Sequence, residues 1–522
     1  MRAARAALAA ALIALLAGCA TIPVAGPVNE AGPIAEGEDL GFDFRPQGPA
    51  IGASPEEILS GFIAAGAGPQ NNYEVARQFL TADFAPEWDP NAGTFVHSRA
   101  TSTIVESDTS LRLLVPASGR VDGTGRYEEY GDQLPTELRF RLVQESGEWR
   151  IGEAPGGTVV ARSLFDRLFA QRALYFYDPS FTYLVPDLRW FPATADAPTR
   201  IVEALLDGPA DPLAAPVLVS AFPEGTTLAR QSVTTTAGEA VVELSDEVVR
   251  ADPTTRQRMQ VQLARSLVGR NVVSVRISVD GSEPTAPVGG GTPILQPQVN
   301  PRPLVLRDGA FGFLVGDGVE SVDGLSDVVE ELAPSAAVFE GDTERLALLT
   351  ATGVVAMEAG QDAVAVDERA GLIAPGLDSQ GFVWTVPADS PEALRVTPVG
   401  GASVDIATPW QEASAIVSLG VSRDSTRLLV LLETPEGTRL RVHGIVRDGA
   451  GAPVALSADG FELVPAEGTP VAATWVSETA VGSLAVDANG VGAIVTQDVA
   501  GHQLDAVADV PGAVALVGGN GL

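Results

Sequence analysis

The chain has 522 residues but only one cysteine, Cys19, which lies close to the N-terminus. A disulfide needs two cysteines, so no disulfide within this chain can stabilise its fold. Stability has to come from ordinary apolar cores, and the length is sufficient for about three or four of them. The sequence therefore predicts a multidomain protein that folds without disulfides.

The residues before Cys19 have the pattern of an export signal. Arg2 and Arg5 precede an uncharged apolar run over residues 6–17, which is too short to span a bilayer as a stable helix. The run leads through Leu-Ala-Gly into Cys19, which resembles the lipobox of bacterial lipoproteins. The resemblance implies cleavage of a signal peptide over residues 1–18, a diacylglycerol and an N-acyl lipid (palmitate) on Cys19, and anchoring on the extracytoplasmic face of the cell membrane. The alternative is an ordinary secretory signal with an incidental cysteine.

The chain is strongly acidic. All 33 basic residues are arginine, and the formal net charge at pH 7 is −34. The excess is largest toward the C-terminus, where residues 300–522 contain 10 arginines and 31 acidic residues. Such a surface repels phosphate backbones, so nucleic acid is a poor partner. The absence of lysine, with abundant alanine, glycine and valine, indicates a GC-rich genome.

Residues 19–53 are rich in proline, glycine and alanine and are predicted to be a tether. A first domain is predicted over residues 54–160. Its first helix opens with a capping box, in which Ser54 is the cap, Pro55 the first helical residue and Glu57 the third.

The same domain continues with a second predicted helix after Asn72, which carries Val75 and Phe79 on its apolar stripe. From about Thr101 the apolar period changes to two, and Gly147 is predicted to form a turn between strands. Two helices followed by a curved antiparallel sheet predict an α+β fold. This order resembles cystatin-like and nuclear-transport-factor-like domains.

Residues 163–281 alternate strands and helices and are predicted to form an α/β-type domain. Helical stripes precede Gly208 and Gly269, which are predicted to lie just past the helix ends. The domain resembles a GerMN domain in four segments: Leu174-Tyr175-Phe176, Leu205-Leu206-Asp207-Gly208-Pro209, Phe222-Pro223-Glu224-Gly225-Thr226 and Val275-Arg276-Ile277-Ser278-Val279-Asp280-Gly281.

Residues 282–303 contain six prolines and a run of three glycines and are predicted to be a linker. The remaining residues, 304–522, show only short apolar strands separated by turns, with no helical stripe longer than one turn. Strand–turn units recur at roughly forty residues, which suits a four-stranded blade. Their predicted starts are near Pro303, Ala333, Leu372, Ala413 and Val471. A β-propeller of about five or six blades is expected, with a pair of β-sandwiches as the alternative.

Taken in order, the lipobox, the α+β domain, the GerMN domain and the terminal propeller resemble the LpqB lipoproteins of actinobacteria. The resemblance implies an accessory role in two-component regulation. Its expected partner is the extracellular domain of an MtrB-type sensor histidine kinase linked to cell-wall metabolism and division. No enzyme activity and no cofactor besides the lipid on Cys19 are expected.

Few residues are suited to catalysis or metal binding. His97, His443 and His502 fall in different predicted units, and none has metal-ligand spacing to a cysteine, histidine or carboxylate. No catalytic residue and no metal site are therefore predicted. The pairs Glu330-Glu331 and Asp367-Glu368 are carboxylate candidates only because acidic residues are so common. The acidic segment over residues 487–490 is predicted to be a hairpin turn rather than a calcium loop.

Aromatic residues are concentrated between Tyr175 and Phe191, in a chain that is only 6% aromatic. Some of these rings are expected at a domain junction or a partner site. The predicted partner-binding residues are Tyr183, Arg189 and Trp190, with Trp190 presented on the surface; the alternative is a core tryptophan. Two other functions remain open. One is a module that captures a cell-wall fragment or peptide, and the other is an envelope hydrolase, for which the sequence offers least support.

Overall fold

The computed structural model describes residues 46–130, 135–269, 272–283, 292–341, 344–499 and 503–519. Cys19, the predicted signal peptide, His502 and the three glycines of the predicted linker lie outside these residues. The described strands form nine sheets. Within the same residues, no helix is both long and apolar enough to cross a membrane.

The N-terminal domain opens with α2 (Pro55–Ala65), and the predicted capping box is confirmed. The Ser54 hydroxyl accepts a hydrogen bond from the Glu57 amide at 3.3 Å, and the Glu57 carboxylate accepts one from the Ser54 amide at 2.8 Å. The apolar face of α2 supplies Ile58, Leu59 and Phe62 to the core of this domain.

The second helix, α3 (Gln70–Arg77), differs from its prediction. It begins before Asn72, and Asn71, Asn72 and Tyr73 have left-handed backbone angles, with φ of 49°, 56° and 58°. Phe79, predicted on the helical stripe, lies past the end of the helix, although its side chain is buried. Burial of the Tyr73 ring against Trp88, with centroids 6.1 Å apart, accompanies this departure from regular helix.

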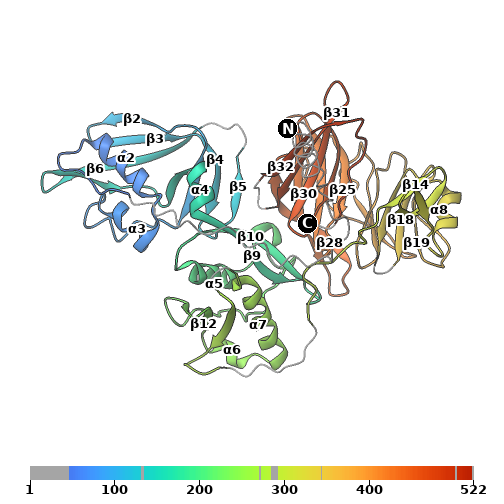
Figure 1. Cartoon of the computed structure of the whole chain (residues 1–522), viewed down its shortest axis with the longest axis horizontal. Coiled ribbons are helices and arrows are strands. Elements are labelled where there is room, and N and C mark those ends of the chain that lie inside the picture. Colours follow the sequence, from blue (N-terminus) through green and yellow to red (C-terminus); the bar gives the residue numbers. More distant parts are fainter. Residues whose placement is uncertain are drawn as a thin grey trace, which may run out of the picture. The chain divides into compact units, whose positions relative to one another are not determined.

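Two four-stranded sheets follow, in the orders β2-β3-β6-β7 and β5-β4-β1-β8. The helices α2 and α3 lie along the first sheet (Figure 1). The predicted turn at Gly147 joins β6 to β7, with Ser146 and Gly147 both at positive φ. The strands are β1 (Gly93–His97), β2 (Ser102–Ser107), β3 (Ser110–Val115), β4 (Ala117–Asp122), β5 (Tyr127–Glu129), β6 (Thr136–Glu145), β7 (Glu148–Glu153) and β8 (Thr158–Ala161). The short helix α4 (Arg162–Leu168) comes next.

The middle domain combines a two-stranded sheet, β9-β10, with a three-stranded sheet, β11-β12-β13, in which β12 and β13 are parallel. Helix α5 ends before Gly208, which has φ 104°, a value that favours glycine. The elements are β9 (Phe169–Tyr177), β10 (Leu184–Pro192), α5 (Ala197–Asp207), η1 (Asp211–Leu213), β11 (Thr234–Thr236), β12 (Glu239–Glu243), α6 (Glu247–Arg250), α7 (Pro253–Leu267) and β13 (Ser274–Ser278).

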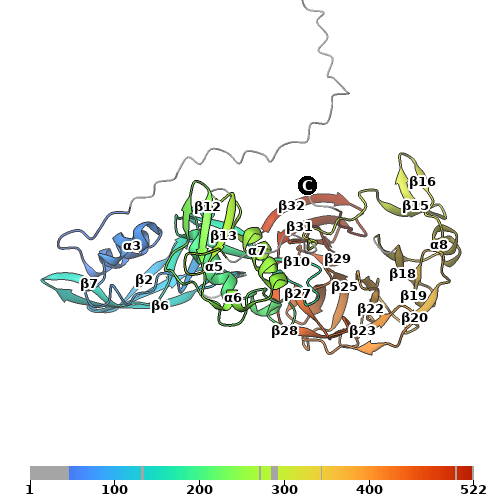
Figure 2. The same cartoon turned by 90° about the horizontal axis from the view of Figure 1, so that it is seen from below.

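The C-terminal domain consists, over its described residues, of five antiparallel sheets that follow one another in chain order. Figure 2 shows them arranged around a ring. The first sheet has three strands and the others have four. They are β14 (Leu304–Arg307), β15 (Ala310–Val315) and β16 (Gly318–Glu320); β17 (Ala336–Glu340), β18 (Arg345–Thr350), β19 (Gly353–Glu358) and β20 (Val364–Asp367); β21 (Gly376–Leu377), β22 (Phe382–Thr385), β23 (Arg395–Pro398) and β24 (Val404–Asp405); β25 (Ala415–Val421), β26 (Arg427–Thr434), β27 (Gly437–Arg447) and β28 (Pro453–Leu463); β29 (Thr469–Trp475), β30 (Ala480–Val486), β31 (Val491–Asp498) and β32 (Gln503–Pro511).

The predicted fold class is confirmed as a multidomain chain with a propeller-like C-terminal domain, and the sandwich alternative is excluded. One detail of the prediction was wrong. Helix α8 (Ser326–Leu332), longer than a single turn, packs on β15 and buries Val329. Leu325, Val329 and Leu332 have helical spacing, so the signal was present in the sequence, but it spans only two turns within a region of strand–turn units.

Candidate functional site

The predicted partner-binding residues lie on β10 or directly before it. This strand pairs antiparallel with β9 along its whole length, from Leu184 opposite Tyr177 to Pro192 opposite Phe169. Asp187 and Arg189 are two residues apart and therefore point to the same face, while Trp190 points to the other. The strand thus carries a charged pair on one face and an aromatic ring on the other.

Arg189 and Asp187 form a fully buried ion pair. The guanidinium donates two hydrogen bonds to the carboxylate, from Nε to Oδ1 at 3.1 Å and from Nη2 to Oδ2 at 2.7 Å. Both side chains are at most 2% exposed. Burial disfavours the charged guanidinium, but the adjacent Asp187 carboxylate outweighs this effect, so the pKa of Arg189 is raised above its usual value.

The pair connects the middle domain to the N-terminal domain. Arg189 Nη1 donates to the carbonyl and the hydroxyl oxygen of Thr124, at 3.0 and 2.8 Å, in the loop between β4 and β5. Asp187 Oδ2 also accepts the amide of Ala210 at 2.8 Å. Sequence reasoning missed Asp187 and Thr124. The available signal was two opposite charges, two residues apart, inside an otherwise apolar strand.

Trp190 is not presented on the surface, so that expectation was wrong. Its side chain is 7% exposed, and its ring lies 5.0 Å from Phe165 and 6.1 Å from Tyr127, centroid to centroid. Its amide donates to the carbonyl of Gly125 at 2.6 Å. The ring is buried because α4 and β5 lie over the end of β10 and supply these aromatic neighbours. The core alternative therefore holds, and it predicts a loss of ~3–5 kcal/mol in stability for Trp190→Ala.

Tyr183 is half-buried where the middle domain meets the propeller. Its hydroxyl donates to the hydroxyl of Ser379 at 3.2 Å. At the other end of the β9–β10 sheet, where Gln171 pairs with Trp190, the Gln171 side chain donates to the Asp498 carboxylate at 2.9 Å. Tyr183, directly before β10, and Arg189 and Trp190, within it, thus all lie at contacts between domains. None of them forms a freely exposed contact surface.

The loop over residues 123–126 is shared by all three domains. Thr124 and Gly125 bind β10 as described, and the Arg126 guanidinium lies 5.3 Å from the ring centroid of Phe461 in β28. Asp122 Oδ1 holds the loop by accepting the amides of Thr124 and Arg126, at 2.8 and 3.0 Å. We call this segment the hub loop.

A polar cleft of about 400 Å³ lies between the N-terminal and middle domains, beside the hub loop. Its volume is within the range of small-molecule sites, and such sites favour domain junctions. One wall is a stripe of α5 and its N-terminal flank that presents Asp196, Arg200, Glu203 and Asp207. Tyr73, Asn91 and Trp190 are among the residues of the facing and flanking walls.

The left-handed residues in the first turn of α3 also reach this cleft, through Asn72 and Tyr73. Left-handed angles are rare for a residue as large as tyrosine and require support from the surrounding structure. Burial, together with the nearby Asp196 and Asp89 and against the opposing effect of Arg200, raises the pKa of Tyr73 to about 12. The phenol therefore remains neutral at physiological pH.

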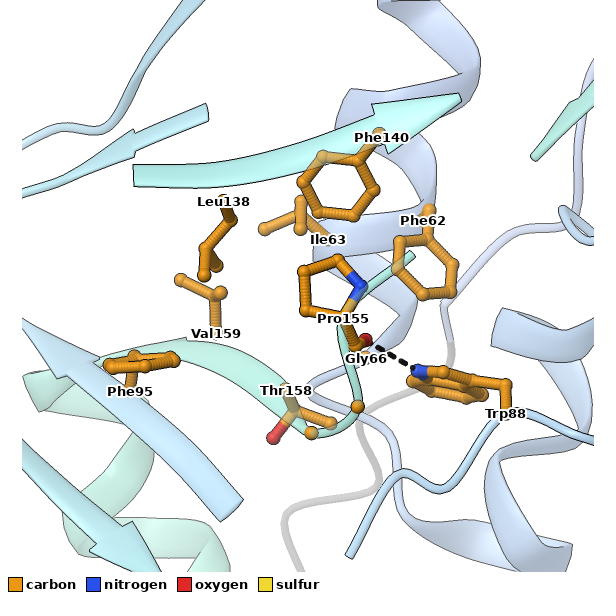
Figure 3. Close-up of a pocket in the computed structure, with 12 residues that line it drawn as sticks. Phe62, Ile63, Gly66, Trp88, Phe95, Leu138, Phe140, Pro155, Thr158 and Val159 are labelled. Carbon is orange, nitrogen blue, oxygen red and sulfur yellow. Dashed lines mark hydrogen bonds between the residues drawn. The ribbon is translucent and has the colours of Figure 1, made fainter. Parts of the chain in front are cut away.

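The core of the N-terminal domain contains a much smaller space. The cavity shown in Figure 3 measures about 10 Å³, which is about the space of one water molecule. Phe62, Phe140 and Trp88 fill its surroundings, and Trp88 Nε1 donates to the carbonyl of Pro155 at 3.2 Å. This space belongs to a packed core.

The histidine and acidic side chains that could serve in catalysis or metal binding do not cluster in the part of the chain that the structure describes. Among the described residues, no group of three histidine, cysteine or acidic side chains is placed to hold a metal ion. His97 bonds the carbonyl of Arg99 at 2.8 Å, whereas His443 is buried against Trp410, with ring centroids 5.4 Å apart. The predicted hairpin turn over residues 487–490 joins β30 to β31, and Asp487 caps it by accepting the amides of Asn489 and Val491.

Three family models match consecutive parts of the chain. Residues 48–166 match the N-terminal domain of lipoprotein LpqB, residues 173–285 match a domain described as sporulation and spore germination, and residues 309–521 match the LpqB β-propeller domain. These families are not known as enzyme families.

Curated relatives carry the same description. The chain is 32% identical to lipoprotein LpqB of Cutibacterium acnes, over 54% of this chain and 48% of that protein. It is 30% identical to LpqB of Thermobifida fusca, over 60% and 54% of the two chains, and 27% identical to LpqB of Bifidobacterium longum, over 82% and 75%. The matches to the first two relatives span about half of the length of those proteins.

Among solved structures, the first GerMN domain of the sporulation protein GerM from Bacillus subtilis is 25% identical, with a TM-score of 0.19. The match covers 24% of this chain and 93% of that domain. Kluyveromyces lactis Hsv2 is 13% identical, with a TM-score of 0.25, over 36% of this chain and 61% of that one.

Proposed function

Because the chain belongs to the LpqB family of lipoproteins, we propose that it is an accessory regulator of a two-component sensor histidine kinase, anchored by lipid on the extracytoplasmic face of the cell membrane. In this proposal Cys19 carries the lipid, and the folded domains contact the extracellular domain of the kinase. The regulated processes are cell-wall metabolism and division. No cofactor besides the lipid is involved.

The observation that best supports this proposal is the shared hub loop. Domains within one chain often move independently, unless their interface is extensive. Here a buried ion pair, a buried tryptophan and a cation–π contact meet in one four-residue loop. Such coupling suits a protein that presents a defined surface to a partner.

The predicted partner-binding residues then act indirectly. Arg189 and Trp190 are buried, so they support partner binding by fixing the domains relative to one another. Tyr183 does the same toward the propeller through Ser379.

The test uses the full-length lipoprotein in nanodiscs together with the purified full-length kinase and its response regulator. We expect capture of the kinase through its extracellular domain and a change of at least about twofold in response-regulator phosphorylation. Cys19→Ala protein should lose metabolic labelling with palmitate and leave the membrane fraction. If the wild-type lipoprotein neither captures the kinase nor changes phosphorylation, the regulatory role is wrong.

A second candidate function is favoured by the polar cleft. We propose, as the alternative, that the lipoprotein captures a cell-wall fragment or peptide there. Screening muropeptides against the full-length protein separates the two functions, because a regulator that acts only through protein contact does not respond to them.

A further inference from the structure

The carboxylates that line the polar cleft differ in whether they have an ion-pair or hydrogen-bond partner. Asp196 is paired with Arg200, with Oδ2 3.0 Å from Nε. Asp122 is occupied by the amides of the hub loop. Glu203 and Asp207 have no ion-pair partner among the residues that the structure describes.

Glu203 and Asp207 lie four residues apart on α5, so both carboxylates project from one side of the helix into the cleft. This arrangement is unfavourable in the free protein. Like charges at this spacing repel each other, and Asp207 lies in the last turn of the helix, where the helix dipole disfavours a negative charge. Partial burial and the neighbouring Asp207 and Asp196 raise the pKa of Glu203, with Arg200 opposing them.

The other residues that line the cleft indicate which further chemical groups a ligand should carry. Asn72, Asn91 and Gln231 offer side-chain amides, each able to donate and to accept hydrogen bonds. Peptide groups complement such amides. Trp190 and Phe191 add aromatic residues to the lining.

We propose that this cleft binds a short peptide that carries a protonated primary amine, with Glu203 and Asp207 receiving the amine and the side-chain amides binding the peptide groups. The inference rests on the second candidate function and names the chemistry of its ligand. A bound ammonium group relieves the repulsion between the two carboxylates. Ligand binding therefore accounts for two carboxylates at a spacing that is unfavourable in the free protein.

The test uses the full-length protein and the tripeptide Gly-Lys-Gly with both ends blocked, so that the lysine amine is its only charge. Its matched control is the same tripeptide with the lysine amine acetylated. Isothermal titration should show binding of the free amine at least about tenfold tighter than binding of the acetylated form. Binding of the free amine should also weaken as the salt concentration rises.

The test variant is Glu203→Gln combined with Asp207→Asn, and the matched control is Glu224→Gln, an exposed carboxylate of the same domain outside the cleft. The double variant should weaken binding at least about tenfold, and the control should leave it unchanged. Because the double variant removes a like-charge pair, its melting temperature should not fall. A retained melting temperature separates loss of binding from loss of fold.

Each outcome has a defined meaning. Equal binding of the two tripeptides, full binding by the double variant, or no binding by the wild type up to 10 mM peptide overturns the inference; that ceiling corresponds to only about 2.7 kcal/mol of affinity. If muropeptides without a free amine bind to the wild type while the tripeptide does not, the capture function stands and only the amine assignment fails. If neither binds, the capture function fails as well.

Discussion

The middle domain is joined to its two neighbours in different ways. Toward the propeller, buried apolar residues of both domains form one continuous cluster, which includes Leu213 and Val217 on one side and Leu440 and Phe461 on the other. Toward the N-terminal domain, whose core is a separate cluster, the connection runs through the Arg189–Asp187 pair and Trp190. An extensive apolar junction resembles a domain interior, whereas a junction built from one ion pair and one packed ring depends on those few contacts. The chain therefore combines one extensive apolar junction with a smaller one that we expect to be sensitive to single substitutions.

Arg189→Met is expected to have the largest effect, because it breaks the polar junction and leaves Asp187 buried without its cation. Removing one partner of a buried pair costs ~3–5 kcal/mol. Denaturant unfolding should show this loss, together with earlier release of the N-terminal domain in limited proteolysis. Arg189→Met combined with Asp187→Asn should recover most of the loss, since the asparagine still accepts the Ala210 amide. Similar losses for both variants would contradict the role assigned to the ion pair.

The propeller side should respond to pH. Burial lowers the pKa of His443 to about 4 from 6.5, despite the bond of its Nδ1 to the carbonyl of Ser457. Between these values the unfolded chain binds the proton and the folded chain does not, so the free energy of unfolding falls as the pH drops from 6.5 toward 4. The loss over this range amounts to about 3 kcal/mol.

Thermal melts of the wild type and of His443→Leu across pH 4–7 test this dependence. The variant should show a smaller decrease in melting temperature between pH 6.5 and 4. An identical pH dependence in the two proteins would mean that His443 is not the group responsible.

Gly444→Ala tests the apolar junction directly. An added Cβ would lie 2.5 Å from the carbonyl oxygen of Pro212 in η1 and within 2.8 Å of the Val217 methyl groups. Overpacking of this kind costs ~1–3 kcal/mol. Gly449→Ala is the control, because an added Cβ there meets no atom within 4 Å. Equal melting temperatures for the two variants would show that the two domains do not approach as closely as the structure indicates.

Ser54→Ala is expected to have the smallest effect. It removes the cap of α2, which typically contributes about 1 kcal/mol, while the Glu57 bond to the Ser54 amide remains available. The loss should be confined to the N-terminal domain, as followed by amide exchange of α2. Faster exchange in the propeller would show that the N-terminal domain is coupled more widely than through the hub loop.

Local sequence signals predicted the fold well because they depend on nearby residues. The predicted repeat starts near Ala333, Leu372 and Ala413 fall within about four residues of β17, β21 and β25. The capping box of α2 and the turn at Gly147 were equally local. The left-handed residues in the first turn of α3 were not predictable, because they depend on tertiary burial of Tyr73.

The candidate site was predicted less well for the same reason. Some rings of the aromatic-rich segment were expected at a domain junction or a partner site, and Tyr183 lies at a junction. Whether Trp190 is covered depends on α4 and β5, which lie outside that segment. The cleft depends on two domains meeting, and no sequence window contains both. Acidic residues at helical spacing, such as Glu203 and Asp207, are visible in the sequence, but whether an arginine lies within ion-pair distance of them is not.

The hub loop has a consequence for how this chain can vary over evolutionary time. Hairpin loops ordinarily accept insertions, because their tips face solvent and touch nothing. Here an added residue would displace Thr124 from Arg189 and Arg126 from Phe461 in one event. The connection between β4 and β5 is thus expected to keep its length among relatives, even where the sequence around it drifts.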